Sequence, residues 1–110
     1  MKTINSVELQ GRLGADPELR TFDNGTSVAR VSLAIDESWK DKKSGEWKKN
    51  THWIRLVFWN DLAKQVADTY TKGVLINISG KLSTNRYTSK DGIEKTIIEI
   101  VVLDIKEIVQ

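Results

Sequence analysis

The sequence predicts a small all-β protein with one short helix. Alternating apolar and polar residues recur along the chain, glycine-containing turn dipeptides separate these runs, and only one segment has helical spacing. The length of 110 residues fits one domain, which we expect to span 1–110. There is no cysteine, no apolar run long enough for a membrane span and no secretory pattern. We therefore expect a cytoplasmic protein without membrane contact.

The first two expected strands lie before residue 36. Residues 4–13 alternate apolar and polar side chains, and their glycine allows the sharp bending that a small barrel needs. The dipeptide Asn24-Gly25 then predicts a tight hairpin turn. Four apolar residues at every second position predict the core face of the second strand: Ala29, Val31, Leu33 and Ile35.

The third strand leads into the one expected helix. The core face of residues 51–59 is predicted to consist of three residues: Ile54, Leu56 and Phe58. Asn60 or Asp61 can cap the start of a helix, and Gly73 can end it. Between them, apolar residues recur at a spacing of four: Leu62, Val66 and Tyr70.

Two further strands complete the pattern. Residues 74–87 are the fourth, and the residues expected to face the core are Val74, Ile76, Ile78 and Leu82. After a turn at Asp91-Gly92, residues 93–109 form a last, β-branched strand. The order β-β-β-α-β-β is that of a five-stranded Greek-key barrel, the oligonucleotide/oligosaccharide-binding (OB) fold. Such barrels bind across their second and third strands and the adjoining loops.

The stretch from Trp39 to Trp59 holds all four tryptophans of the chain. It contains six lysine and arginine residues against two acidic ones, so its net charge of +4 exceeds the +2 of the whole chain. Flexible cations among large flat rings suit a partner made of flat bases joined by phosphates. The expected partner is therefore single-stranded nucleic acid, and composition alone leaves both DNA and RNA open.

Strand alternation sharpens this interpretation. Trp53, Arg55, Val57 and Trp59 fall on one face, opposite the predicted core face. An unpaired charge is costly to bury, so we interpret this face as an exposed binding surface. The alternative is that both tryptophans are packing residues and that Arg55 is a surface charge lying over them.

Five segments carry a resemblance to a known family. They are G-R-L-G-A-D-P-E-L-R at 11–20, L-A-I-D-E-S-W-K-D-K at 33–42, H-W-I-R-L-V-F-W at 52–59, Y-T-K-G at 70–73 and I-S-G-K-L-S-T-N-R-Y-T at 78–88. In this order they are similar to the DNA-binding domain of bacterial single-stranded-DNA-binding proteins. The resemblance implies sequence-tolerant binding and protection of single-stranded DNA in replication, recombination or repair. It also implies a place in the cytoplasm, on the nucleoid, and no cofactor or metal.

The resemblance further implies roles for single residues. The rings expected to stack on bases are Trp39, Trp53, Trp59 and Tyr87. The cations expected to contact phosphates are Lys40, Lys42, Lys48, Arg55, Lys72 and Arg86. Local composition alone adds Lys43, Lys49 and Lys81. Trp47 lies where the family is not ordinarily aromatic, and we interpret it as a ring that pins the loop, with a further stacking ring as the alternative.

Two features depart from the family pattern. The resemblance implies a homotetramer, but Ile54 stands where a histidine is common at a subunit contact, so a dimer is the alternative. The chain ends at Gln110 without the flexible, acidic-tipped tail through which family members recruit repair and replication proteins. We therefore do not carry that recruitment over to this chain.

Two other functional classes fit the sequence less well. Enzyme activity is not expected, because His52 is the only histidine and there is no paired-carboxylate, P-loop or dinucleotide motif. An OB-fold protein-interaction module, such as a primosome-type accessory subunit, would also expose aromatic rings and arginine. The lysines favour DNA, because the cores of protein interfaces are depleted in lysine whereas phosphate-binding surfaces are rich in it.

Overall fold

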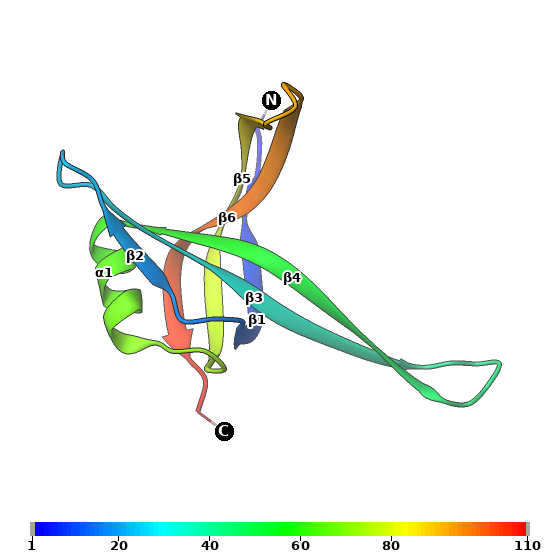
Figure 1. Cartoon of the computed structure of the whole chain (residues 1–110). Helices are drawn as coiled ribbons and strands as arrows, with labels where there is room; N and C mark the ends of the chain where they lie inside the picture. The colour runs from blue at the N-terminus through cyan, green and yellow to red at the C-terminus, as the bar shows by residue number, and fades with distance from the viewer. Residues whose placement is uncertain (1, 110) are drawn as a thin grey trace.

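The computed structural model describes residues 2–109, which form six strands and one helix (Figure 1). In chain order the elements are β1 (Val7–Leu13), β2 (Glu18–Thr21), β3 (Ser27–Lys40), β4 (Trp47–Trp59), α1 (Asn60–Thr69), β5 (Leu75–Thr88) and β6 (Glu94–Glu107). The predicted all-β class with one helix after the strand that ends at Trp59 is confirmed. Strands β3 and β4 run for 14 and 13 residues, well past the segments expected from alternation.

The strands close into a barrel. Their order is β1-β5-β6-β4-β3-β2, and β1 also pairs with β3 at Arg12↔Ala34 and Leu13↔Leu33. Strands β4 and β6 pair in parallel, while the other pairs are antiparallel. Five strands thus form the predicted OB-fold barrel. Gly11 stands where β1 crosses β3, and a Cβ there would overlap the carbonyl oxygen of Ala34, so this glycine permits the closure.

The short strand β2 was not expected from the sequence. It pairs with β3 as the first arm of the hairpin whose turn contains Asn24-Gly25, where Gly25 has a φ of 89°. All four of its residues are exposed. A strand without a buried face has no alternating pattern, so only the turn signal marked it.

The hydrophobic core fills the inside of the barrel. Its fully buried residues include the predicted core faces of β3, β4 and β5: Ala29, Leu33, Leu56, Phe58, Ile76 and Ile78. Helix α1 closes one end with Ala63 and Val66, both at 0% exposure, and the following Tyr70 packs against the same core. Leu62 and Ile54 are partly buried at its rim.

Helix α1 begins differently from the prediction. Its N-cap is Trp59, and no side chain caps it. Asn60 instead has a φ of 55°, and its Oδ1 accepts a hydrogen bond from the backbone N–H of Ser27 at 3.3 Å. Asp61 lies in the first turn, where its charge favours the helix dipole. Within residues 2–109 no helix has both the length and the apolar character needed to cross a bilayer.

Strand β5 departs from its predicted core face after Ile78. A β-bulge lies at Ser79/Gly80, and beyond it Leu82 is 45% exposed and not in the core. The N-terminal segment before β1 reaches this place, where the Asn5 side chain makes two hydrogen bonds of 2.8 Å with the backbone of Leu82. The prediction for Leu82 is wrong because β5 and β6 leave the barrel here as a two-stranded arm (Figure 1).

Candidate nucleic-acid interface

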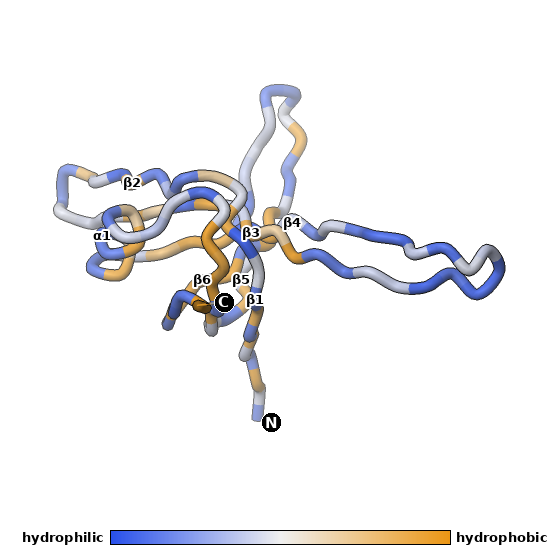
Figure 2. Tube along the Cα trace, turned by 90° about the horizontal axis from the view of Figure 1, so that it is seen from below, coloured by the Kyte–Doolittle hydropathy of each residue, from blue (hydrophilic) through white to orange (hydrophobic). Residues whose placement is uncertain are grey.

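Two hairpin arms project from the barrel (Figure 1). One is the end of β3 and the start of β4, which we call the β3–β4 arm (residues 36–51), and the other is formed by the ends of β5 and β6. Figure 2 shows that the β3–β4 arm is mainly hydrophilic, whereas most hydrophobic positions lie in the barrel. The arm therefore gains little from burial and presents its side chains to solvent.

The register of β3 and β4 decides which residues share the barrel's outer face. Directly opposite residues of antiparallel strands lie on one face. Four such pairs fall on the outer face: Ala34↔Trp53, Ser32↔Arg55, Arg30↔Val57 and Val28↔Trp59. Trp53 is 62% exposed and Trp59 40%, while Leu56 and Phe58 on the opposite face are fully buried. The two indoles are therefore surface rings, and the interpretation of them as core packing is wrong.

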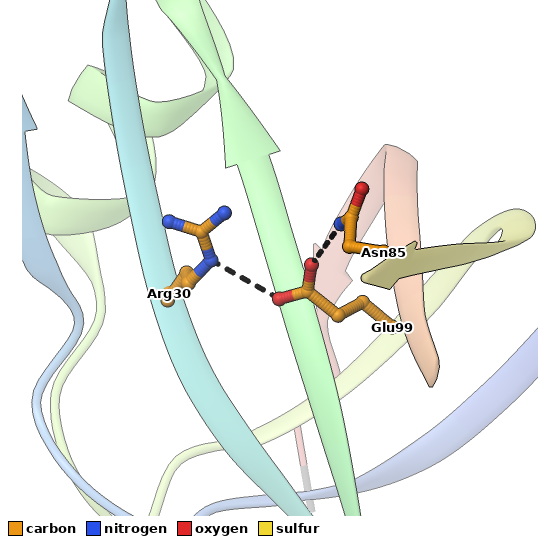
Figure 3. Close-up of polar contacts among 3 residues, drawn as sticks. All are labelled: Arg30, Asn85 and Glu99. Carbon is orange, nitrogen blue, oxygen red and sulfur yellow. Dashed lines mark hydrogen bonds and ion pairs between the residues drawn. The ribbon is translucent and has the colours of Figure 1, made fainter. Parts of the chain in front are cut away.

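Val57 was expected to be exposed with its neighbours, but it is only 2% exposed. It lies opposite Arg30 of β3 on one side and Val101 of β6 on the other. An ion pair bridges these two strands over β4: the Nε of Arg30 donates a hydrogen bond to Oε2 of Glu99 at 3.0 Å (Figure 3). This bridge covers Val57.

Glu99 is a site residue that the sequence analysis missed. Its side chain is 6% exposed, and its other oxygen, Oε1, accepts a hydrogen bond from Nδ2 of Asn85 at 2.7 Å (Figure 3). The available signal was a single acid inside the apolar run I-I-E-I-V-V. Burying a carboxylate there is costly unless it is hydrogen-bonded, which indicates a partner of opposite charge nearby.

Two adjoining hollows open at the outer face, and the second also reaches Val7, Leu9, Ile54 and Ile100 at the rim of the barrel. The first, which we call the arginine hollow, is lined by Arg30, Arg55, Trp59, Asn85, Arg86 and Glu99. The second, the ring hollow, is lined by Trp53, Arg55, Leu82, Tyr87, Ile97 and Ile98. Arg55 belongs to both. The structure therefore brings together five of the predicted site residues, from β4 and the β5–β6 arm: Trp53, Arg55, Trp59, Arg86 and Tyr87.

The β3–β4 arm places its two tryptophans on opposite faces. Lys40 pairs with Trp47 and Trp39 with Lys48, so alternation puts Lys40 and Trp47 on the face that carries Trp53, and the other pair on the reverse face. Trp39 is 49% exposed and Trp47 72%. With most of its ring in solvent, Trp47 does not pin the loop as the sequence suggested.

Lysines of the arm differ in their partners. Nζ of Lys48 lies 3.8 Å from a carboxylate oxygen of Glu46, and that of Lys49 lies 3.6 Å from Asp36. Lys40 and Lys42 have no ion-pair partner in the part of the chain that the structure describes. Lys72 lies in the turn between α1 and β5, whereas the other cations that the resemblance implies lie on the β3–β4 arm or line the arginine hollow.

One carboxylate of the arm has a shifted pKa. The hydroxyl of Thr51 donates a hydrogen bond of 2.7 Å to Oδ1 of Asp36. This bond, with the charge of Lys49 beside it, lowers the pKa of Asp36 below its usual value. Both contacts link Asp36 of β3 to residues of β4 across the arm. Among residues 2–109 no group of three or more histidine, cysteine or acidic residues could hold a metal ion.

Comparison with known proteins bears on this arrangement. A family model described as "Single-strand binding protein family" matches residues 4–108. Among solved structures, one described as "Plasmodium falciparum SSB complex with ssDNA" is similar with a TM-score of 0.86 at 30% sequence identity. The similarity covers 98% of this chain and 97% of that chain, so it includes the barrel, the helix and both arms.

Proposed function

This chain belongs to the single-strand binding protein family, and we propose that it binds single-stranded DNA by stacking unpaired bases on its exposed rings. As a member of this family it is a DNA-binding protein and not an enzyme. Lysine and arginine side chains hold the phosphates between the stacked bases. Because every base has a flat face, this mode tolerates any sequence.

The observation that carries the proposal is the outer face of β4. On the barrel part of β4, residues 53–59, Trp53, Arg55 and Trp59 occupy every outward position but the covered Val57, and the two rings are 62% and 40% exposed. Exposed indoles are costly to leave in water unless something covers them in the working state. Tyr87 and Arg86 reach the same hollows from the β5–β6 arm, so a strand lying across β4 meets rings and cations from two elements.

Rings and cations contribute differently to such binding. A base stacked on an aromatic ring is worth about 1–3 kcal/mol by alanine substitution, whereas an exposed ion pair is worth about 0–1 kcal/mol. We therefore assign most of the affinity at high salt to Trp53, Trp59, Tyr87 and Trp39. Lys40, Lys42, Lys48 and the arginines of the hollows set the salt dependence, because they displace counterions from the phosphates.

The biological setting follows from this binding mode. We assign the protein to the protection of single strands during replication, recombination or repair, in the cytoplasm. For its assembly we propose a homotetramer. Residues 7–10 of β1 pair with β5 on one side, and within residues 2–109 no strand pairs with their other edge, which can therefore accept a second copy. Analytical ultracentrifugation tests this: a tetramer is expected, and a monomer at micromolar concentration contradicts it.

A direct binding comparison tests the function. Fluorescence anisotropy measures the affinity for labelled oligo-dT, for RNA of the same length and for duplex DNA of the same length. The affinity for oligo-dT should exceed that for the duplex by a wide margin, because duplex bases are already stacked on each other. RNA binding as tight as DNA would widen the substrate to any single strand. No binding to either strand would contradict the proposal and favour a protein-interaction module.

A further inference from the structure

The bridge that covers Val57 contains a buried acid in a surface proposed to bind a polyanion. Glu99 is 6% exposed, and each of its carboxylate oxygens accepts one hydrogen bond, from Arg30 at 3.0 Å and from Asn85 at 2.7 Å. Such a carboxylate is stable only because both partners are in place. Yet the negative charge of Glu99 repels phosphate, so its presence in a DNA-binding surface needs an explanation.

The way in which Arg30 is held offers the explanation. Its guanidinium uses Nε toward Glu99 (Figure 3). Within residues 2–109 its two terminal Nη groups have no protein partner. A guanidinium has five N–H donors, so four remain for a ligand. The side chain is 54% exposed, which leaves those donors accessible. Glu99 thus fixes the direction of the fork and keeps its outer edge free.

Arg30 stands at the centre of the proposed binding surface. It lies opposite Val57, and its diagonal neighbours on β4 are Arg55 and Trp59. The arginine hollow is lined by three arginines and one carboxylate, so it stays cationic even though Arg86 also pairs with Glu94 at 3.4 Å. A base stacked on Trp59 would place its own phosphate beside Arg30.

We propose that Arg30 is a further phosphate-binding residue and that Glu99 is its positioning residue. This inference rests on the proposed function and deepens it. The paired Nη groups match two oxygens of one phosphate, a geometry that the single ammonium of a lysine cannot supply. Glu99 holds Arg30 in place before DNA arrives, and this gain in order offsets the repulsion between its own negative charge and the phosphates.

The first test removes the fork. Arg30→Ala should weaken oligo-dT binding by about fivefold at low salt. It should also lower the slope of log affinity against log salt by about 0.7, the value of one phosphate contact. Lys64→Ala is the matched control, because it removes the same charge from the exposed face of α1, away from both hollows. An Arg30→Ala slope equal to that of the control overturns the inference.

Arg30→Lys separates the fork from the charge. Its ammonium is expected to stay on Glu99, so affinity should fall nearly as far as in Arg30→Ala although the net charge is unchanged. Because the position is half exposed, this variant should fold normally. Wild-type affinity in Arg30→Lys would overturn the proposed bidentate contact. A loss confined to guanine-containing strands, with the salt slope unchanged, would assign Arg30 to a base and also overturn it.

The positioning role of Glu99 gives a prediction of opposite sign from simple electrostatics. Glu99→Gln removes a negative charge from the hollow, so charge alone predicts tighter DNA binding. If Glu99 positions Arg30, Glu99→Gln should instead weaken DNA binding by about twofold or more. The same change made in the Arg30→Ala variant should cause no further loss. Tighter binding in the single variant overturns the positioning role. Should Glu99→Gln lower the melting temperature strongly, Glu99→Asp decides: it keeps the charge but shortens the reach to Nε of Arg30, so weaker DNA binding is expected and wild-type binding overturns the positioning role.

These experiments distinguish a failure of this inference from a failure of the proposed function. If wild-type protein fails to bind oligo-dT, the proposed function fails and this inference with it. If wild-type protein binds and Trp59→Ala weakens binding, while Arg30→Ala and Arg30→Lys behave as wild type, only the present inference fails.

Discussion

The outer face of the barrel and the β3–β4 arm each carry two tryptophans, but they hold them differently. On the barrel, Trp53 and Trp59 stand on a closed sheet whose opposite face is the core, beside a guanidinium fixed by a buried carboxylate. On the arm, Trp39 and Trp47 stand on a two-stranded ribbon held by exposed pairs such as Asp36–Lys49.

The two regions differ in the free energy needed to order their side chains when DNA binds. A side chain on the barrel face is already in place when DNA arrives, because the backbone beneath it is part of a packed core. Immobilising a mobile side chain or loop on binding costs about 0.5–1.5 kcal/mol per side chain. The same indole is therefore worth more on the barrel than on the arm, and the barrel face should dominate the affinity.

Trp59→Ala is expected to have the largest effect. It removes a stacking ring from the ordered face, and oligo-dT affinity should fall about fivefold to over a hundredfold. The loss should be similar at low and high salt, because no charge is removed. Trp59→Phe keeps a ring and should retain most of the affinity. An unchanged dissociation constant in Trp59→Ala would show that this ring takes no part.

Alanine at either tryptophan of the arm should cost less, about three- to tenfold, because ordering the arm offsets part of the stacking energy. Trp47→Ala should weaken only oligonucleotides long enough to reach from the barrel to the arm. Isothermal titration with a series of oligo-dT lengths measures this. The contrast between the barrel face and the arm would be contradicted by one result. Trp39→Ala or Trp47→Ala would weaken the binding of short strands as much as Trp59→Ala does.

Replacing Lys42 and Lys48 together with alanine should change the salt dependence more than the affinity at high salt. The slope of log affinity against log salt should fall by about 0.7 for each phosphate that the variant no longer neutralises. Lys48 already lies near Glu46 at 3.8 Å, so Lys42 should account for most of the change. A double variant with the wild-type slope would place the DNA elsewhere than along the arm.

The smallest expected effect concerns the pH dependence of the arm. The Thr51 hydroxyl and Lys49 lower the pKa of Asp36, so the stabilisation they give is present above the usual carboxyl pKa and is lost as pH falls through the lowered value. In Thr51→Val the pKa of Asp36 should move back up. NMR titration of the carboxyl group measures it, and an unmoved pKa would mean that the hydrogen bond does not hold the arm.

The sequence predicted those parts of the fold that bury a face. Alternation located the core residues of β3 and β4, such as Leu33 and Phe58, because one face of each strand is sealed. It missed β2, which buries nothing, and it placed Leu82 in the core, because a bulge and a departing arm leave no trace in local composition.

The candidate site was predictable where one element carries it. Trp53, Arg55 and Trp59 could be assigned to one face from spacing alone. The bridge between Arg30 and Glu99 could not, because it joins residues 69 apart across an intervening strand. The same bridge explains why Val57, expected in solvent, is covered. Pairing of that kind depends on barrel closure and not on any local pattern.

The central claim is that unpaired bases lie flat on exposed indoles, and tryptophan fluorescence tests it most directly. Titration with oligo-dT should quench the emission strongly and to saturation at high salt, and Trp59→Phe should reduce the amplitude of quenching. Duplex DNA of equal length should leave the emission nearly unchanged. Tight binding of oligo-dT without quenching, or equal quenching by duplex, would contradict the account.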